Sequence, residues 1–563
     1  MTLALAILPL AALILAMTVQ APKLRLPLPA QHALPLAAAL AGIVQLIYLN
    51  LPGHASGAVI EIYARIVEGL LASLTPLGIV FGAILLFNTL DRAGAMRVLT
   101  TQLQRISPHP VAQVMLVGWA FSYLLEGLSG FGTPAALAAP ILVGLGFPAV
   151  RAAAACLVMN TIPVVFGAVG TPIWFGMGEL GLTDDEITNL ARRAALIQIA
   201  AAPVVALLAL AILFPWSTIV RALHYILPVV AAPLAASFAV ARFSVEFPSI
   251  IGGLAGLAAA IALARTLRAP HQPPHSSPSS PHEPAGPRLS TLRAATPFLL
   301  TVALLAATRL EALGLKALLT ANSPRAHLNL APLGDLSLSP SGVIRLEHIF
   351  NTDIAWSMPV LYVPFIIPFV LVSLITIPLL RIPAPTVRSV WADTTARLVR
   401  PAVALAGALV LVKLLMHGGA QAPVVLIGQH LADVVAMINP DLWPAVAPLL
   451  GALGSFFSGS ATVSNLTFAP VQLAIAERLD LDTATVLAMQ AIGGALGNMV
   501  CVHNIVAVAA VLGLIRAAGA TTDNDDDARP SDEVAHPVSH ILHRTTLPLL
   551  AACAASAAAL LVL

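Results

Sequence analysis

The sequence predicts an all-α polytopic membrane protein with about 12–14 transmembrane helices, and two observations lead to this prediction. Hydrophobic residues make up 58% of the 563 residues and charged residues only 10%, with a mean hydropathy of +0.92. A soluble domain carries about 25% charged residues, so a soluble enzyme, a disordered protein and a nucleic-acid binder are excluded. In addition, apolar runs of about 20 residues recur from end to end, whereas the alternating segments of a β-barrel do not occur.

The predicted spans form two sets separated by a polar stretch. The first set occupies 3–19, 34–50, 70–90, 111–126, 152–175, 194–214, 222–241 and 244–264. The second occupies 294–313, 357–380, 401–416, 423–438, 443–457, 484–515 and 545–563. The first segment has no charged n-region or cleavage site, so it is predicted to be a retained span rather than a signal peptide. The chain therefore divides into an N-terminal membrane half, 1–264, and a C-terminal membrane half, 294–563.

The stretch between the halves, 265–293, is rich in Pro, Ser and His and is predicted to be a disordered cytoplasmic linker. Its histidines lack a geometry for binding metal, and no metal or cofactor is expected. The acidic segment 516–544 is predicted to be a solvated connector. The three cysteines lie singly inside apolar runs, so they are predicted to be small buried hydrophobic residues: Cys156, Cys501 and Cys553.

Orientation follows from the placement of Lys and Arg. Basic clusters follow the first span, the third span and the span at 357–380, and all three are expected in the cytoplasm. The first cluster then places the N-terminus outside. The stretch 321–356 is the expected outer loop.

Each half contains a matching pair of interrupted apolar segments. In the first half, a Gly- and Thr-rich break lies in 127–147 and is followed by an interrupted helix, 152–175. In the second half, 455–479 and 484–515 repeat this arrangement. Broken segments at corresponding places are the sequence signature of a transporter's binding site. We therefore predict two inverted repeats, each with a re-entrant hairpin and a broken helix. Close helix packing through small residues is the alternative reading.

The hairpin tips are candidates for binding an anion without a buried Arg or Lys. Helix ends at such a tip expose N–H groups and a partial positive charge, and unwound backbone at membrane depth lines a cavity or is buried in protein. The nearby hydroxyls and amides suit a small carboxylate that also carries a hydroxyl group. The candidate substrate-binding residues are Ser129, Gly130, Gly132, Thr133, Asn160, Ser460, Thr462, Ser464 and Asn465.

Ionisable residues inside apolar runs are costly and usually functional, and three of them are candidates here. Glu126, which ends such a run, is the candidate for proton coupling; the alternative is a static, ionised carboxylate. His503 is a second candidate for proton relay, or a core histidine bonded to backbone. Lys413 is either a charge partner of the substrate or a side chain that reaches toward the membrane interface.

The chain lacks the motifs of ATP-driven or enzymatic chemistry. It has no P-loop, no HExxH motif and no histidines at metal-ligand spacing. The sequence therefore indicates a secondary transporter rather than an enzyme.

The interrupted segments also resemble a known family. LLEGLSGFGTPAALAAPILVGLGF with NTIPVVFGAVGTPI, and GSFFSGSATVSNLTFAPVQ with GGALGNMVCVHNIVAVAAVLGL, are similar to the paired signatures of the L-lactate permease family. The similarity runs in order from about residue 60 to 515. The chain departs from some members at Asn498, where they have Lys, and at Val502-His503, where they have Pro-Gln. The matching positions are Glu126, Gly127, Gly130, Phe131, Gly132, Thr133, Pro134, Asn160, Pro163, Gly167, Gly170, Gly459, Ser460, Thr462, Ser464, Asn465, Gly493, Gly494 and Gly497.

The resemblance implies import of L-lactate or a related 2-hydroxy-monocarboxylate, such as glycolate, by proton symport. It implies a multi-pass protein of the bacterial cytoplasmic (inner) membrane whose partners are this solute, protons and lipid, and not nucleic acid. A sodium-coupled carboxylate or anion transporter is the alternative within the same structural class. A membrane-embedded enzyme subunit is the alternative from another class.

Overall fold

The computed structural model describes residues 3–18, 28–49, 58–130, 133–267, 289–309, 313–514 and 537–561. Most of the predicted linker 265–293 and most of the acidic connector 516–544 lie outside these ranges. Contacts divide the chain into two compact units, and each unit combines segments from both halves of the sequence. Unit 1 comprises 1–98, 289–440 and 469–481, and unit 2 comprises 99–288, 441–468 and 482–563. The predicted division into the membrane halves 1–264 and 294–563 is a different division, and it remains a prediction.

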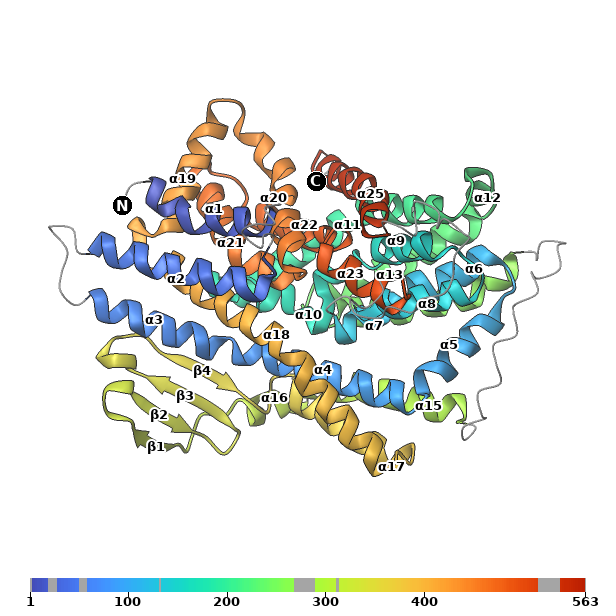
Figure 1. Ribbon diagram of the computed structural model, residues 1–563, viewed down its shortest axis with the longest axis horizontal. Helices are drawn as coiled ribbons and strands as arrows, with labels where there is room; N and C mark the ends of the chain where they lie inside the picture. The colour runs from blue at the N-terminus through green and yellow to red at the C-terminus, as the bar shows by residue number, and fades with distance from the viewer. Residues whose placement is uncertain are drawn as a thin grey trace, which may run out of the picture. The chain divides into compact units, whose positions relative to one another are not determined.

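Unit 1 is built around one long helix, α18 (Ala384–Met416), which packs against α2, α3 and α4 (Figure 1). Gly407 and Gly69 allow these contacts, because a Cβ at Gly407 would lie 2.5 Å from Pro35 N and one at Gly69 would lie 2.7 Å from Val410 Cα. The other elements of unit 1, with the start of α5, are α1 (Leu3–Thr18), α2 (Ala30–Leu49), α3 (Ala58–Ala72), α4 (Leu74–Arg92), α5 (Ala95–Ile106), α15 (Thr291–Arg309), α16 (Leu315–Leu319), the π-helix η9 (Phe365–Leu371), α17 (Val372–Leu379), η10 (Gly419–Gln421) and α19 (Pro423–Ala436).

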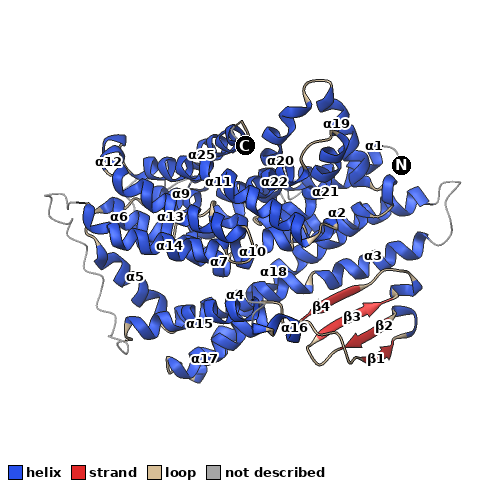
Figure 2. Cartoon of the chain, turned by 180° about the vertical axis from the view of Figure 1, so that it is seen from behind, coloured by secondary structure: helices blue, strands red, loops and turns tan. Residues whose placement is uncertain are grey.

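The predicted outer loop contains a small β-sheet that the sequence analysis missed (Figure 2). Four antiparallel strands follow in the order β1 (Ala326–Asn329), β2 (Asp335–Leu338), β3 (Val343–Glu347) and β4 (Trp356–Pro359), with the short turns η7 (Ala331–Leu333) and η8 (Ile349–Asn351) between them. Leu346 pairs with Leu336 on one side and with Trp356 on the other. The strands have only four or five residues each, so their alternation is too brief to stand out from loop sequence.

Unit 2 holds the first predicted interrupted region and most of the second, whose residues 469–479 belong to unit 1. Its elements are α6 (Pro110–Val114), the π-helix η2 (Met115–Phe121), α7 (Ser122–Ser129), α8 (Thr133–Gly144), α9 (Ala149–Met159), η3 (Pro163–Phe166), α10 (Gly167–Trp174), η4 (Gly178–Leu180), α11 (Asp184–Leu213), α12 (Trp216–Arg221), α13 (Leu223–Ala241), α14 (Pro248–Leu263), η5 (Ala264–Thr266), α20 (Trp443–Ser458), α22 (Thr483–Leu496), η12 (Gly497–Met499), α23 (Val502–Val511) and α25 (Pro537–Ala559). Helix α21 (Ala461–Arg478) begins in unit 2 and ends in unit 1, and η11 is Pro440–Leu442.

The predicted polytopic helical class is confirmed. Within the described ranges, nine helices are long and apolar enough to cross a membrane, and the count reaches eleven if each of two bent pairs is one span. Three further apolar helices are shorter, at 3–17, 134–144 and 366–379. The predicted number of 12–14 includes segments of this shorter kind. The three cysteines are buried and form no disulfide, as the sequence predicts.

The interruptions lie where small residues break the apolar sequence. Helix α7 ends at Ser129, with Gly130 at φ 60°, and α8 begins at Thr133. Helix α20 ends at Ser458, with Gly459 at φ 71°, and α21 begins at Ala461. The chain bends by 53° between 149–159 and 163–180, and α22 is separated from α23 by η12. The inverted relation of the two repeats remains a prediction.

Candidate functional site

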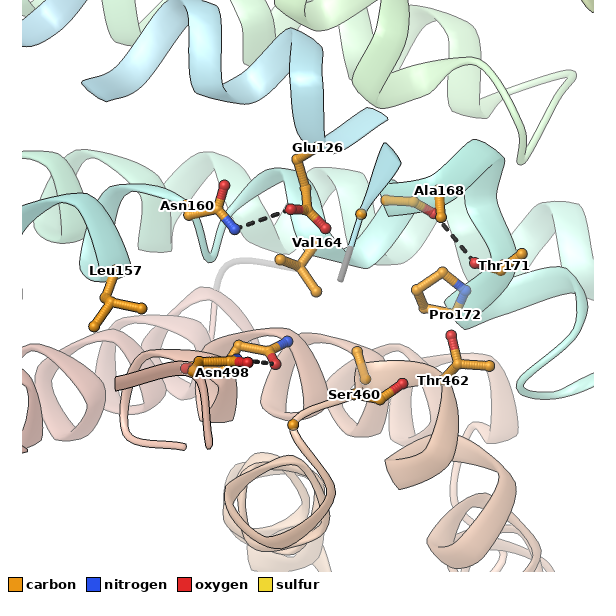
Figure 3. Close-up of a pocket in the computed structure, with 15 residues that line it drawn as sticks. Glu126, Leu157, Asn160, Val164, Ala168, Thr171, Pro172, Ser460, Thr462 and Asn498 are labelled. Carbon is orange, nitrogen blue, oxygen red and sulfur yellow. Dashed lines mark hydrogen bonds between the residues drawn. The ribbon is translucent and has the colours of Figure 1, made fainter. Parts of the chain in front are cut away.

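A small cavity in unit 2 brings the two interrupted regions together (Figure 3). Glu126 and Asn160 line one side of it, and Ser460, Thr462 and Asn498 lie opposite. The cavity has a volume of about 30 Å³, and because a cavity needs about 10–15 Å³ of such volume to hold one water molecule, it has room for about two. The remaining lining residues come from the same segments: Gly130, Leu157, Val164, Gly167, Ala168, Thr171, Pro172, Gly459, Ala461 and Asn504.

Glu126 is 2% exposed, and its carboxylate is held between Asn160 and Gly167. Asn160 Nδ2 donates a hydrogen bond of 2.9 Å to Glu126 Oε2. A Cβ added at Gly167 would lie 2.6 Å from Glu126 Oε1, so only glycine leaves room for the carboxylate here. Asn160 Oδ1 is buried and accepts no hydrogen bond from the part of the chain that the structure describes. The pair therefore consists of a buried carboxylate and a buried amide whose oxygen has no donor in the described residues.

The first broken helix is strained where it passes the cavity. Ala168, Val169 and Gly170 follow one another in the left-handed region, with φ of 44°, 59° and 74°. L-residues rarely adopt this conformation, and for a β-branched valine it is especially unfavourable. Trp174 Nε1 donates a hydrogen bond of 2.8 Å to Val169 O and helps to hold the turn. Strain of this kind persists where the surrounding structure over-determines it, which is common at ligand sites and switch regions.

Side chains from α11 and α14 donate hydrogen bonds to carbonyl groups at the break between α9 and η3. Gln198 Nε2 of α11 donates 2.6 Å to Ile162 O, and Ser249 Oγ of α14 donates 2.7 Å to Pro163 O. Backbone carbonyls at membrane depth need such partners, because hydrocarbon offers none. These bonds explain how an irregular segment stays ordered inside an apolar unit.

The second hairpin carries hydroxyl groups to the opposite side of the cavity. Ser460 Oγ accepts from Val463 N at 3.3 Å, so it caps the start of α21. Ser460 N donates 3.2 Å to Ser458 Oγ within the same turn. Thr462, 4% exposed, is on the first turn of α21 and also lines the cavity.

A network of amides anchors this hairpin to its neighbours. Asn465 Nδ2 donates 2.7 Å to Pro172 O of the first broken helix, and Ser464 Oγ donates 2.6 Å to Gly451 O of α20. Gln490 Nε2 of the second broken helix reaches both Ser464 Oγ, at 3.3 Å, and Asn465 Oδ1, at 3.4 Å. Ser464 and Asn465 therefore hold the second hairpin against its neighbours and do not line the cavity.

The structure unites some of the sequence-predicted site residues and separates others. Five of them line the cavity: Glu126, Gly130, Asn160, Ser460 and Thr462. Ser129 Oγ instead donates 2.8 Å to Leu125 O in its own helix. His503 is exposed and lies near Gly459 but does not line the cavity. Gly132 and the side chain of Thr133 lie outside the described part of the chain.

Sequence reasoning did not name Asn504, the residue that follows His503, as a lining residue. Asn504 donates 3.1 Å from its Nδ2 to Asn498 Oδ1, and both amides face the cavity from the second broken helix. Asn504 is polar within an apolar helix, and this signal was available in the sequence. In the described residues no cluster of three His, Cys, Asp or Glu can hold a metal ion.

Lys413 belongs to unit 1 and has a carboxylate partner there. Its Nζ lies 2.6 Å from Glu68 Oε1, and Arg65 Nη1 lies 2.8 Å from Glu68 Oε2. The Lys413 side chain is 12% exposed, so it is largely enclosed by the protein.

The fold and this cavity define a multi-pass membrane permease. Residues 3–521 match the L-lactate permease family, and the chain belongs to that family. It is 39% identical over 492 residues to a Haemophilus influenzae protein named "Putative L-lactate permease", covering 87% of this chain and 90% of that one. It is 25% identical over 506 residues to the L-lactate permease of Escherichia coli K12, covering 85% of each. A shorter match, 33% over 168 residues, covers 27% of this chain and 30% of the glycolate permease GlcA of E. coli K12.

Proposed function

We propose that this protein is a secondary active transporter that imports L-lactate, or a related 2-hydroxy-monocarboxylate such as glycolate, by proton symport across the bacterial cytoplasmic membrane. Membership of the L-lactate permease family supports the substrate class, and relatives are named for lactate and for glycolate. The observation that carries the proposal is the buried Glu126–Asn160 pair facing the hydroxyl-lined hairpin across one cavity.

The two sides of the cavity match the two polar groups of a 2-hydroxy acid. The hydroxyls of Ser460 and Thr462, at the start of α21, suit the carboxylate because they can donate hydrogen bonds beside the positive end of a helix dipole. Asn160 Oδ1 has no donor among the described residues, and we expect the α-hydroxyl of the substrate to donate to it when the cavity opens. A site that pairs a buried group with a substrate hydroxyl discriminates strongly against analogues that lack it.

Glu126 supplies a simple means of coupling. Two unit charges about 5 Å apart repel by about 3 kcal/mol at an effective dielectric constant of about 20. An ionised Glu126 therefore opposes the binding of an anionic substrate in the same cavity, and a protonated Glu126 removes that repulsion. Binding of the anion and of a proton then favour each other, which is the condition for symport.

Transport requires that the cavity widen, because a space with room for about two water molecules is too small for lactate. Hinges are available next to the lining residues at Gly130, at 168–170 and at Gly459, all of which have positive φ. Separation of the hairpin tips toward one side of the membrane, then the other, would give alternating access.

The test is uptake of radiolabelled L-lactate into proteoliposomes with an imposed pH gradient, an imposed sodium gradient, or neither. We expect accumulation with the pH gradient, acid outside, and none with sodium alone. Accumulation driven by sodium alone would contradict proton symport and support the sodium-coupled alternative. Recovery of the label as a different compound would favour the enzyme alternative.

A further inference from the structure

Unit 1 contains a second cavity, distant in sequence from the residues of the lactate site. Helices α2 and α3 both pack against the C-terminal half of α18 and leave between them an apolar groove of about 480 Å³. Its walls are aliphatic and small side chains, with Tyr63 the one residue that carries a hydroxyl. Gly42 widens the groove, since a Cβ added there would have only one neighbour, Leu414 Cδ1 at 3.7 Å.

The directions of the three helices show where this groove ends. Pro35 lies against Gly407 and Gly42 against Leu414, so α2 runs parallel to α18. Gly69 lies against Val410, and the groove residue on α3 closest to its C-terminus is Leu70. The groove therefore ends near Val403 on α18, toward the N-terminal part of that helix.

On α18, Arg400 precedes Val403 by three residues and Arg397 precedes Arg400 by three. Residues three apart lie about 60° apart around a helix, so Arg400 lies near the face that carries Val403, whereas Arg397 lies about 120° from Val403. Both arginines are exposed, and helical side chains lean toward the N-terminus. The guanidinium group of Arg400 is thus placed to extend the line of the groove beyond its end.

The other charges of the neighbouring helices favour an anion at that end and not at the opposite one. Glu68 of α3 is occupied by Lys413 and Arg65, and Glu61 lies 3.8 Å from His417, beyond the C-terminus of α18. Asp393, one turn before Arg397, forms an ion pair of 2.7 Å with Arg92. Of the basic residues on the described helix α18, Arg400 is then the one nearest to the Val403 end on the side of the groove.

We propose that this groove binds one acyl chain of an anionic phospholipid, whose phosphate is held by Arg400. A long cavity with almost purely apolar walls fits a hydrocarbon chain. Arginine is suited to phosphate because its fork donates two parallel hydrogen bonds. Basic side chains next to grooves between membrane helices are a recurrent means of recognising anionic lipid headgroups.

The experiment is native mass spectrometry of the full chain in detergent, titrated with phosphatidylglycerol or with phosphatidylcholine of identical acyl chains. We expect one tightly bound phosphatidylglycerol, preferred over phosphatidylcholine by on the order of tenfold. Arg400→Gln should lose the preference, while Arg397→Gln, an exposed arginine on a different face of α18, should keep it. Gly42→Leu, which fills the groove, should lose the bound lipid of both kinds.

Retention of the preference in Arg400→Gln, or of the bound lipid in Gly42→Leu, would overturn the proposal. A dimer that Gly42→Leu dissociates, with no tightly bound lipid in the wild type, would instead assign the groove to a second copy of this chain. If Gly42→Leu is not monodisperse in detergent, Ala39→Leu, at an exposed position on the same groove wall, is the alternative variant.

Discussion

Asn160 Nδ2 donates a hydrogen bond of 2.9 Å to Glu126 Oε2 between two helices of unit 2, and both side chains are at least 95% buried. The Asn160 amide oxygen has no donor among the described residues, and Glu126 Oε1 lies next to Gly167. One pair of residues thus joins the proposed proton site to the proposed site for the substrate hydroxyl. The predictions below test the two roles separately.

Glu126→Gln should abolish accumulation of lactate driven by a pH gradient. Counterflow, the exchange of labelled for unlabelled lactate, should continue, because exchange needs no net movement of protons and glutamine mimics the neutral acid. Asp185→Asn, an exposed carboxylate at the start of α11, is the control and should transport normally. If Glu126→Gln still accumulates lactate against its gradient, the carboxylate is structural, and His503 is the next residue to test.

Asn160→Ala should reduce the discrimination between lactate and propionate, which lacks the α-hydroxyl. Loss of one hydrogen bond to a buried group is worth about 1–3 kcal/mol, so the ratio of inhibition constants in competition uptake should fall roughly tenfold or more. An unchanged ratio would show that Asn160 Oδ1 does not contact the hydroxyl.

Thr462→Val should raise the KM for lactate uptake roughly tenfold, because it removes a hydroxyl donor from the cavity and keeps the shape of the side chain. Thr467→Val is the matched control: Thr467 is on the same helix and equally buried, but it bonds to Val463 O and does not line the cavity. Equal KM values for the two variants would favour a packing role for Thr462.

Gly167→Ala should inactivate transport without removing the protein from the membrane. The added Cβ would fall 2.6 Å from Glu126 Oε1, so the carboxylate must leave its position. Gly178→Ala, where an added Cβ meets nothing within 4 Å, should behave like the wild type in uptake and in abundance on immunoblots. Normal transport by Gly167→Ala would mean that the position of Glu126 is not critical.

Lys413→Met should destabilise unit 1, since it leaves Glu68 with Arg65 as its ion-pair partner. Removal of one partner from a buried pair costs up to about 3–5 kcal/mol, and Arg65 should offset part of this. Glu68→Gln combined with Lys413→Met should recover much of the loss. Thermal unfolding in detergent would measure the stability of the single and double variants. If the effects of the two substitutions simply add, Lys413 and Glu68 do not stabilise unit 1 as a pair.

The sequence identified the helix breaks more reliably than it identified the residues at the cavity. Gly130 and Gly459 interrupt apolar runs, and glycine at positive φ is a local property that a sequence displays directly. By contrast, Ser460 and Ser464 belong to one turn of similar residues, and only the packing of α20 and α22 separates their roles. The β-sheet at 326–359 was missed because its strands are short and amount to one loop in an otherwise helical chain.

By itself, the sequence determined the membrane class, the positions of the breaks, the buried carboxylate Glu126 and the family resemblance. These depend on hydropathy, on glycine and on the cost of charge in hydrocarbon, which act residue by residue. The tertiary structure decided which polar residues line the cavity and which hold the hairpin that forms its wall. It also paired Lys413 with Glu68, 345 positions away. Those outcomes depend on contacts between helices that are remote in sequence, and the pattern of a single chain does not contain them.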